Sequence, residues 1–431
     1  MAEARMWGTT IGAVTWDDER GCAAFEYAPA FLPSGRQVAP LTMPLAAGIY
    51  SFPALARETF HGLPGLLADS LPDRFGNALI DAWLTAQGRR PGDFSPVERL
   101  CYVGERGMGA LEFVPATGPD HRQSAVEVAA LVDLAGEILT NRSNLAGSFT
   151  APRRQQALQS ILRVGTSAGG ARAKAVIAWN PATGEVRSGQ VSAGDGFSYW
   201  LLKFDGVAGN RDRELEDPRG YGLIEYAYHL MARAAGITMA DCRILSEGGR
   251  NHFMTRRFDR TAAGDKIHLL SLGAMAHYDF NQAGAHSYEQ ALRVIEQLEI
   301  GKEAVEEQFR RMAFNVVARN QDDHVKNIAF LMDRSGRWSL APAFDVTYSY
   351  NPSGPWTGVH QMSLNGKRDG FAGDDFVACA RNAAMKRGRA SDILGQVGEA
   401  VRRWPEFAGQ AGVPGAVAAN IAAVHRLDVV G

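Results

Sequence analysis

The chain has 431 residues, 46% of them hydrophobic, which is enough for two or three domains with sizeable cores and excludes a disordered protein. Its 45 basic and 47 acidic side chains nearly cancel, so net charge gives no reason to expect binding of the whole chain to nucleic acid or membrane. The scattered cysteines form no CxxC pair and indicate reduced core thiols. We expect a cytoplasmic protein, because neither an export signal nor a long apolar run occurs.

The first region of the chain predicts a small sheet followed by helices. Residues 7–33 alternate apolar and polar side chains around a DDERG turn, as short strands do. Residues 52–86 show apolar spacing near 3.6 with Pro and Gly breaks, and LCYVGERGMGALEFVPA returns to strand character. The polar stretch TGPDHRQSA after Pro115 is rich in turn formers, so we place a first domain at 1–115.

The second region, 116–260, mixes helices, strands and a loop of small residues. A helix over about 124–140 and a second helical pattern, PRRQQALQSILRVG, precede the loop and strand of GTSAGGARAKAVIAWN. Two strand-like stretches follow, GEVRSGQVS and FSYWLLKFDG, and Lys203 lies at the end of the second. YGLIEYAYHLMARAAGI then predicts a helix, and DCRILSEGGRNHFMTRRFDR predicts a hairpin.

The third region, 261–431, is predicted to be mostly helical. Two helices are expected between Ser287 and Asn320, and further helices after Phe371. A chain that begins with sheet and loops and continues with helices and an inserted hairpin is typical of a bilobal α+β protein.

Residues 318–333, ARNQDDHVKNIAFLMD, concentrate polar groups in one short bend. The strand after Asn327, the RSGR turn and the strand that follows predict a hairpin, which would return Asp345 to the edge where Asn327 lies. Carboxylate and amide oxygens are ligands that Mg²⁺ accepts together with substrate phosphates. The spacing matches that of protein kinases, with Asp322 as the acceptor of a substrate hydroxyl proton and Asn327 and Asp345 as metal ligands.

Phosphoryl transfer also needs a phosphate-covering loop and a cation on a strand. Lys174 follows the glycine-rich loop, and Lys203 ends a strand, so both lysines are candidates for the phosphates of ATP. Glu225, on the next helix, is placed to hold Lys203. The loop positions assigned to the phosphates are Gly165, Ser167, Gly169 and Gly170.

These residues resemble the HipA-type serine/threonine kinases of bacterial toxin–antitoxin modules, over nearly the whole chain. The matching motifs, in order, are LPGLLADSLPDRFG, GERGMGALEF, VGTSAGGARAKAVIA, YWLLKF, IEYAYHLMARAAGI, RRFDR, AMAHYDF, NQDDHVKN and LAPAFDV. The resemblance implies a bilobal protein-kinase-like fold of HipA type, with a small N-terminal β-rich subdomain and a largely helical C-terminal lobe. It also implies the roles given above for Asp322, Asn327, Asp345 and Lys203.

The resemblance further implies a toxin that uses ATP and Mg²⁺ to phosphorylate a cytosolic protein hydroxyl, in the translation apparatus. Its partner would be a small helix-turn-helix antitoxin of HipB type, and DNA would be reached through that partner. Ser167 matches the loop serine that such kinases phosphorylate on themselves; capping of the loop's own backbone is the alternative role of this serine.

Two alternatives remain open at this point. A HipA-like protein could be catalytically inert and act only as a corepressor with its partner, although the complete set of kinase residues favours activity. A metal-dependent hydrolase could instead use Asp323, His324 and Asp345 as ligands, because His and Asp bind transition metals. The absence of further paired histidines favours a structural role for His324, in fixing the loop.

Overall fold

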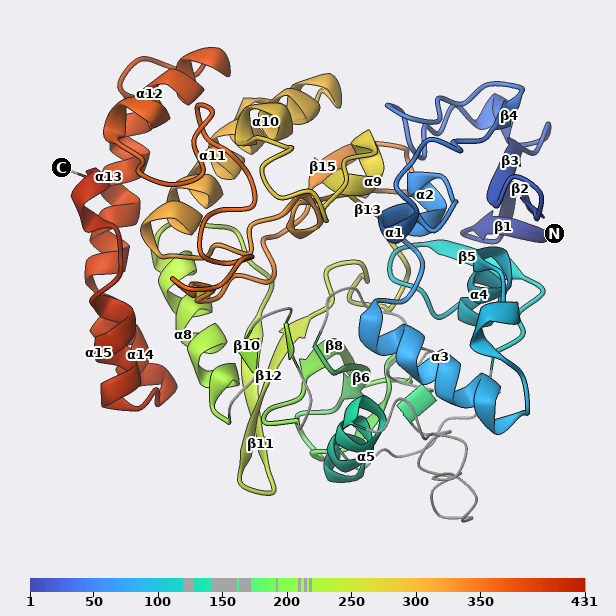
Figure 1. Ribbon diagram of the computed structural model, residues 1–431, viewed down its shortest axis with the longest axis horizontal. Helices are drawn as coiled ribbons and strands as arrows, with labels where there is room; N and C mark the ends of the chain where they lie inside the picture. The colour runs from blue at the N-terminus through green and yellow to red at the C-terminus, as the bar shows by residue number, and fades with distance from the viewer. Residues whose placement is uncertain are drawn as a thin grey trace. The chain divides into compact units, whose positions relative to one another are not determined.

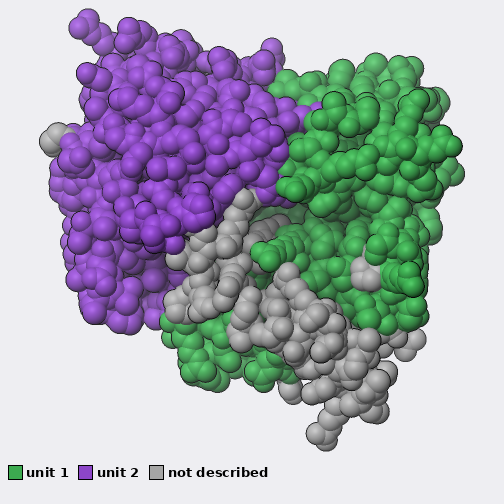
Figure 2. Space-filling view, viewed as in Figure 1, with its two compact units in different colours: residues 1–219, 245–270, 332–336 green, residues 220–244, 271–331, 337–431 purple. Residues whose placement is uncertain are grey.

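The computed structural model shows a chain that divides into two compact units (Figures 1 and 2). Unit 1 comprises Met1–Arg219, Leu245–Leu270 and Met332–Gly336, and unit 2 comprises Gly220–Ile244, Ser271–Leu331 and Arg337–Gly431. Neither unit is continuous in sequence, and the division into 1–115, 116–260 and 261–431 stays a prediction. The structure describes residues 1–118, 128–140, 161–162, 172–190, 193–207, 211–212, 215–216 and 219–430.

Unit 1 begins with an antiparallel five-stranded sheet. Its strands are β1 (Ala2–Met6), β2 (Thr9–Asp17), β3 (Cys22–Tyr27), β4 (Ile49–Tyr50) and β5 (Leu111–Val114), in the order β4-β3-β2-β1-β5. Trp7 and Gly8 both have positive φ, 52° and 79°, as a two-residue hairpin turn requires. The sheet and the turn between β2 and β3 confirm the prediction, but β1 lies ahead of the strands that the sequence pattern identified.

Short helices lie between β3 and β5 in the chain, and the starts of two of them are set by local sequence. Asp73 caps α3 by accepting a hydrogen bond from the Gly76 amide at 2.6 Å. Ser95 and Glu98 form a reciprocal capping box at α4, with Pro96 in the first turn. These elements are η1 (Leu32–Ser34), α1 (Arg57–Phe60), α2 (Gly65–Ala68), α3 (Arg74–Ala86), η2 (Pro91–Asp93) and α4 (Pro96–Val103).

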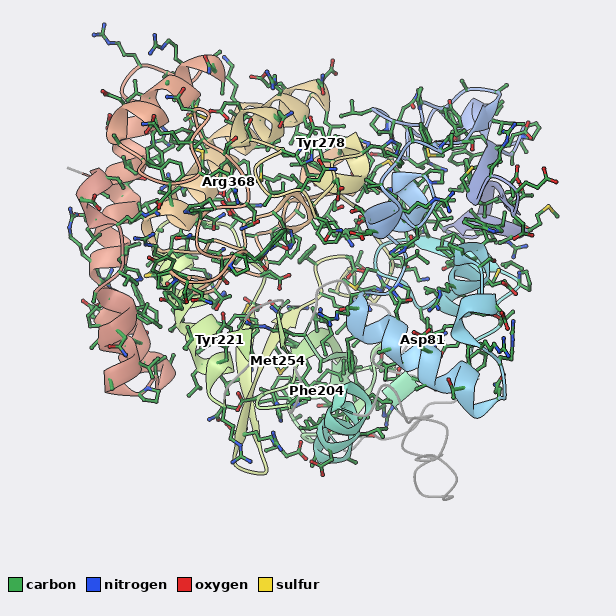
Figure 3. The ribbon with its side chains drawn as sticks, viewed as in Figure 1. Asp81, Phe204, Tyr221, Met254, Tyr278 and Arg368 are labelled. Carbon is green, nitrogen blue, oxygen red and sulfur yellow. The ribbon has the colours of Figure 1, made fainter. Side chains whose placement is uncertain are left out.

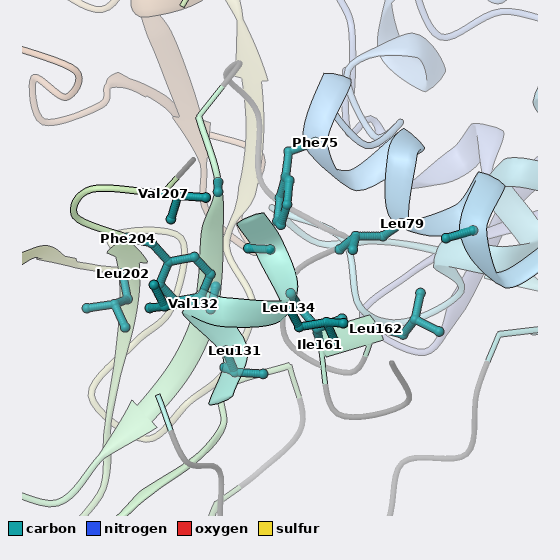
Figure 4. Packing of buried hydrophobic residues seen from close by; sticks show 14 of the residues in the cluster. Phe75, Leu79, Leu131, Val132, Leu134, Ile161, Leu162, Leu202, Phe204 and Val207 are labelled. Carbon is teal, nitrogen blue, oxygen red and sulfur yellow. The ribbon is translucent and has the colours of Figure 1, made fainter. Parts of the chain in front are cut away.

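Most of a second five-stranded sheet also lies in unit 1, in the order β11-β12-β8-β6-β7. Figure 3 labels Phe204, just after β8, and Met254 on β12, which both belong to one buried cluster with α3 and α5 (Figure 4). Burial of apolar area in this cluster stabilises the unit by roughly 25 cal/mol per Å². The elements between residues 128 and 271, apart from α8, are α5 (Val128–Thr140), β6 (Lys174–Trp179), β7 (Val186–Ser188), β8 (Ser198–Lys203), β9 (Arg211–Asp212), β10 (Leu215–Glu216), β11 (Cys242–Glu247), β12 (Arg250–Arg256) and β13 (His268–Ser271).

Three predicted elements of this region can be checked against the described residues. The helix near 124–140 is α5, and the predicted hairpin is β11 with β12, so both are confirmed. Of the second predicted helix only Ile161 and Leu162 are described, and both are helical. The glycine-rich loop lies outside the described residues.

Unit 2 is largely helical, as predicted. α8 packs against α14, α11 against α13, and α10 against α11, while β14 and β15 form the inserted hairpin (Figure 1). The elements are α8 (Tyr221–Ala234), α9 (Leu272–Ala276), α10 (Tyr288–Gln297), α11 (Lys302–Val317), η3 (Val325–Asn327), β14 (Ala329–Met332), β15 (Trp338–Leu340), α12 (Gly373–Asn382), α13 (Arg389–Arg402), α14 (Trp404–Ala411), α15 (Gly415–Ala422) and η4 (Leu427–Val430).

The chain thus has an α+β fold with a β-rich N-terminal region and a helical C-terminal region. Within the described ranges, no helix combines the length and apolar character that crossing a membrane requires.

Candidate active site

The bend between α11 and β14 is held by backbone contacts. After α11 the chain turns at Arg319, whose φ of 58° lies in the left-handed region. The Gln321 amide donates to the Ser349 carbonyl at 3.0 Å, and the Ser349 amide donates to the Arg319 carbonyl at 3.1 Å. These bonds fix the start of the segment that carries Asp322 and Asp323 and leads into η3.

Asp322 and Asn327 are joined across the bend. The Asn327 Nδ2 donates to the Asp322 backbone carbonyl at 2.8 Å, which engages the amide nitrogen and turns the amide oxygen away from that carbonyl. This bond uses the backbone carbonyl of Asp322 and not its carboxylate, and 19% of the Asp322 side chain is exposed. A hard oxygen donor and a carboxylate are thereby presented by one short loop.

The β14–β15 hairpin returns the chain as predicted. The Ala341 amide donates to the Ala329 carbonyl at 2.9 Å, so the residues before β14 and after β15 lie at the same end of the ribbon. Asp345 follows at that end, half-buried and with φ of 51°. Asp is one of the residue types that tolerates this left-handed conformation. The oxygen ligands expected to hold Mg²⁺, Asn327 and Asp345, therefore fit its preference for carboxylate and amide oxygens.

The Asp322 carboxylate accepts a hydrogen bond from Trp356 and lies near His324. Trp356 Nε1 donates to Asp322 Oδ1 at 2.6 Å, and His324 Nε2 lies 4.0 Å from the same oxygen. The His324 ring lies 5.4 Å from the Phe280 ring, and Lys326 Nζ lies 5.0 Å from the Phe280 centroid. The role predicted for His324, in fixing the loop by bonding backbone groups, stays a prediction.

Asp323 is buried in a hydrogen-bond network. Its Oδ2 accepts from the Tyr288 hydroxyl at 2.6 Å and from His360 Nδ1 at 2.8 Å, and its Oδ1 accepts from the Gln361 amide at 2.8 Å. Asn315 Nδ2 donates to the Tyr288 oxygen at 3.1 Å. Burial acts to raise the pKa of Asp323, but the His360 ring and the donated hydrogen bonds hold this pKa below its usual value. Burial, and then the Asp323 charge, raise the pKa of Tyr288 well above its usual value.

This network bears on the hydrolase alternative, which needs Asp323 as a metal ligand. The three hydrogen bonds to Asp323 come from protein groups, so this carboxylate anchors the loop. Among the described residues, no group of three or more His, Cys, Asp or Glu side chains is arranged to hold a metal ion. The structure therefore gives this alternative no support.

The residues predicted to bind ATP are distributed over both units. Lys203 ends β8 in unit 1, half-buried, with its Nζ 5.8 Å from the Phe253 ring centroid. Glu225 is buried on α8 in unit 2, so its pairing with Lys203 stays a prediction. The loop residues assigned to the phosphates lie outside the described residues; they are Gly165, Ser167, Gly169 and Gly170.

Lys174 begins β6 but is buried, and its Nζ lies 3.0 Å from Asp73 Oδ2. Both side chains are at most 5% exposed, so the ammonium neutralises the carboxylate that caps α3. The phosphate role predicted for Lys174 thus competes with a structural role in the interior of unit 1.

Comparison with known proteins identifies the family. A family model described as the HipA N-terminal domain matches residues 2–114, and one described as the HipA-like C-terminal domain matches residues 166–404. The chain belongs to the HipA family. No match is found among the curated proteins.

One solved structure supports a HipA-like fold, and a second match is weaker. A chain of the Shewanella oneidensis MR-1 toxin–antitoxin complex of HipA, HipB and operator DNA is similar with a TM-score of 0.68 and 15% identity, over 100% of this chain and 96% of that chain. The Helicobacter pylori proinflammatory kinase CtkA is similar with a TM-score of 0.35 and 11% identity, over 54% of this chain and 89% of that chain.

Two of the motifs that link the chain to the HipA family prove to be structural. Asp259 of RRFDR is fully buried and accepts hydrogen bonds from Arg257 Nε at 2.8 Å, Arg257 Nη2 at 2.6 Å and Arg260 Nη1 at 2.8 Å. It also accepts the Gly109 amide of GERGMGALEF at 2.7 Å, and Arg260 donates to the Gly107 and Gly109 carbonyls. Burial opposes ionisation, but Arg257 and Arg260 hold the pKa of Asp259 well below its usual value.

The sequence analysis did not identify Tyr288, Trp356 or His360 as residues of the site. Trp356 is 34 residues from Asp322 in the chain, and Tyr288 and His360 are 35 and 37 residues from Asp323, so no local spacing connects them. A contact between two residues so far apart in the sequence cannot be predicted from a local pattern of residue types.

Proposed function

We propose that the chain is an ATP- and Mg²⁺-dependent serine/threonine protein kinase of HipA type. The observation that carries the proposal is the bend itself, in which Asn327 holds the Asp322 backbone while the hairpin returns Asp345 to the same end of the ribbon. This order of a carboxylate, an amide and a second carboxylate is the arrangement used for phosphoryl transfer in protein kinases.

The residues take distinct roles in the proposed reaction. Asp322 orients the substrate hydroxyl and accepts its proton as the hydroxyl oxygen bonds to the γ-phosphorus of ATP, while the bond from that phosphorus to the β,γ-bridging oxygen breaks and ADP leaves. Asn327 and Asp345 would hold Mg²⁺, which would supply positive charge to the phosphates of ATP. Lys203 contributes a further positive charge to the phosphates, and Glu225 orients that lysine.

The proposed biological role is that of a toxin held by an antitoxin. Membership of the HipA family supports this role, and the Shewanella structure is a complex of HipA with HipB and operator DNA. We propose a helix-turn-helix partner of HipB type that carries the DNA contacts, because this chain has a formal net charge of −2. The substrate would be a cytosolic protein of the translation apparatus.

Radiolabel transfer from ATP to protein in a bacterial lysate tests the activity. Transfer should require Mg²⁺ and should be lost in Asp345→Asn, which removes one charged ligand oxygen. Asp374→Ala, an exposed carboxylate on α12 of the same unit, is the matched control and should transfer normally. No transfer by the wild-type chain would favour the inert corepressor instead.

Self-phosphorylation of Ser167 is a separate part of the proposal. A phosphoryl group adds about two negative charges and strong acceptor oxygens, which would compete for the cations that hold ATP. Mass spectrometry after incubation with ATP and Mg²⁺ should find phosphate on Ser167 in the wild type and none in Asp322→Ala. An unmodified Ser167 in the active wild type, or a modified one in the variant, would contradict self-phosphorylation.

A further inference from the structure

The segment 356–361, which follows Asp345 in the chain, contacts both neighbouring carboxylates of the bend. Trp356 Nε1 donates to Asp322 Oδ1 at 2.6 Å. His360 Nδ1 and the Gln361 amide donate to Asp323, each at 2.8 Å. One loop thus holds two adjacent acidic side chains, Asp322 through Trp356, and Asp323 through His360 and Gln361.

The segment is also fixed to the bend by Gln321 and Gln361. Gln321 Nε2 donates to the Thr357 carbonyl at 3.1 Å, and Gln361 Nε2 donates to the Gln321 carbonyl at 3.3 Å. Gln361 Nε2 lies within hydrogen-bond distance of the Trp356 and Val359 carbonyls as well. The side chains of Gln321 and Gln361 thus join the segment 356–361 to the bend, and these bonds hold Trp356 in place beside Asp322.

The contact with Asp322 has the chemistry of an orienting bond. An indole N–H can only donate, so it favours the ionised carboxylate that proton acceptance requires. A hydrogen bond to a charged group is roughly twice as strong as a neutral one.

We propose that Trp356 is a positioning residue for phosphoryl transfer, which fixes the rotamer of Asp322 through its indole N–H while His360 and Asp323 anchor the loop beneath it. This inference rests on the proposed kinase function. It assigns to the segment after Asp345 a direct part in orienting the proton acceptor, beyond the metal-binding role of Asp345 itself.

The substitution Trp356→Phe tests the proposal, since it keeps an aromatic ring and removes the N–H. In the lysate transfer assay over a series of ATP concentrations, the maximal rate should fall roughly tenfold to a hundredfold, as loss of a charge-assisted hydrogen bond predicts. The half-saturating ATP concentration should stay within about twofold of the wild-type value, because a uniform loss of ATP binding would change that concentration instead.

Trp404→Phe is the matched control. Trp404 Nε1 also donates to a protein oxygen in unit 2, the Ala418 carbonyl at 2.9 Å, but makes no contact with the bend residues named above. This variant should lose thermal stability and keep its rate per folded molecule. A wild-type rate in Trp356→Phe would overturn the positioning role.

A measurement independent of activity checks the contact. In ¹H–¹⁵N spectra, the indole resonance of Trp356, assigned by its absence in Trp356→Phe, should move upfield in Asp322→Asn, while that of Trp404 stays in place. An unmoved Trp356 resonance would overturn the proposal. An active wild type with an equally active Trp356→Phe removes only this inference, whereas an inactive wild type removes the proposed function and the positioning role together.

Discussion

Asp259 in unit 1 and Asp322 in unit 2 both lie in sequence motifs typical of the family, yet their surroundings differ. Asp259 is fully buried, and its two oxygens accept hydrogen bonds from two arginines and a backbone amide. Asp322 is 19% exposed and is contacted at Oδ1 by Trp356. A carboxylate saturated by protein donors holds structure together, whereas one that partly faces solvent can accept a proton from another molecule.

The largest expected effect is on catalysis at Asp322. Asp322→Ala should lower the rate of transfer by roughly a thousandfold or more, because it removes the group that positions and accepts the hydroxyl proton. Its thermal unfolding midpoint should stay close to that of the wild type, since the side chain is partly exposed. Transfer near the wild-type rate would show that Asp322 is not needed for catalysis and that it does not differ from Asp259 in this respect.

The next effect is on stability at Asp259. Asp259→Asn removes the negative charge between two buried arginines, and breaking a buried ion pair in this way costs about 3–5 kcal/mol. Urea unfolding should show this loss, while the transfer rate per folded molecule remains. Asp265→Asn is the control: its side chain is 57% exposed beside Arg334, so its unfolding should change by less than about 1 kcal/mol. Equal stability of the two variants would contradict the structural role of Asp259.

A smaller effect is expected at His360, which donates a hydrogen bond to Asp323 and none to Asp322. His360→Leu leaves the buried Asp323 carboxylate without one donor, which should cost about 1–3 kcal/mol of stability and slow transfer. His360→Asn keeps a donor near the position of Nδ1 and should recover most of both losses. If the Asn variant behaves like the Leu variant, the ring and not its hydrogen bond supports the loop.

The smallest effect is the response to acid. The pKa of Asp323 is below its usual value of 3.8 in the folded chain, so this group contributes stability that is present above pH 3.8 and is lost as the pH falls through the lowered pKa. Asp323→Asn should therefore unfold with a shallower dependence on pH below about 4. Parallel pH profiles for the variant and the wild type would show that Asp323 is not ionised more readily than in the unfolded chain.

Local patterns predicted much of the fold because they act over short distances. The period of apolar residues identified the helices of unit 2, and the turn residues around Ser335 identified the β14–β15 hairpin. β1 was not identified, because Glu3 and Arg5 alternate with only three small or apolar side chains in a five-residue strand. Its place in the sheet comes from pairing with β2 and β5.

The candidate site was predictable only in part. Asp322, Asn327 and Asp345 could be named as candidates because the turn and strand pattern around Ser335 predicted the hairpin between Asn327 and Asp345; the structure joins Asp322 and Asn327 by a hydrogen bond, and the shared metal site with Asp345 stays a prediction. The pairing of Lys174 with Asp73 could not, since it joins residues about a hundred positions apart and depends on how α3 packs on β6. The partners of Asp323 were missed for the same reason.

The pairing of Lys174 with Asp73 limits how the chain can be cut into pieces. α3 supplies Phe75, Leu79 and Ile80 to the same core as β6 and β8, and it carries the counter-ion of a lysine that sits at the start of β6. A fragment that ends near residue 118 would expose that apolar face of α3. The complementary fragment would leave a buried ammonium without its carboxylate, so the two pieces should be recoverable as folded protein only when they are expressed together.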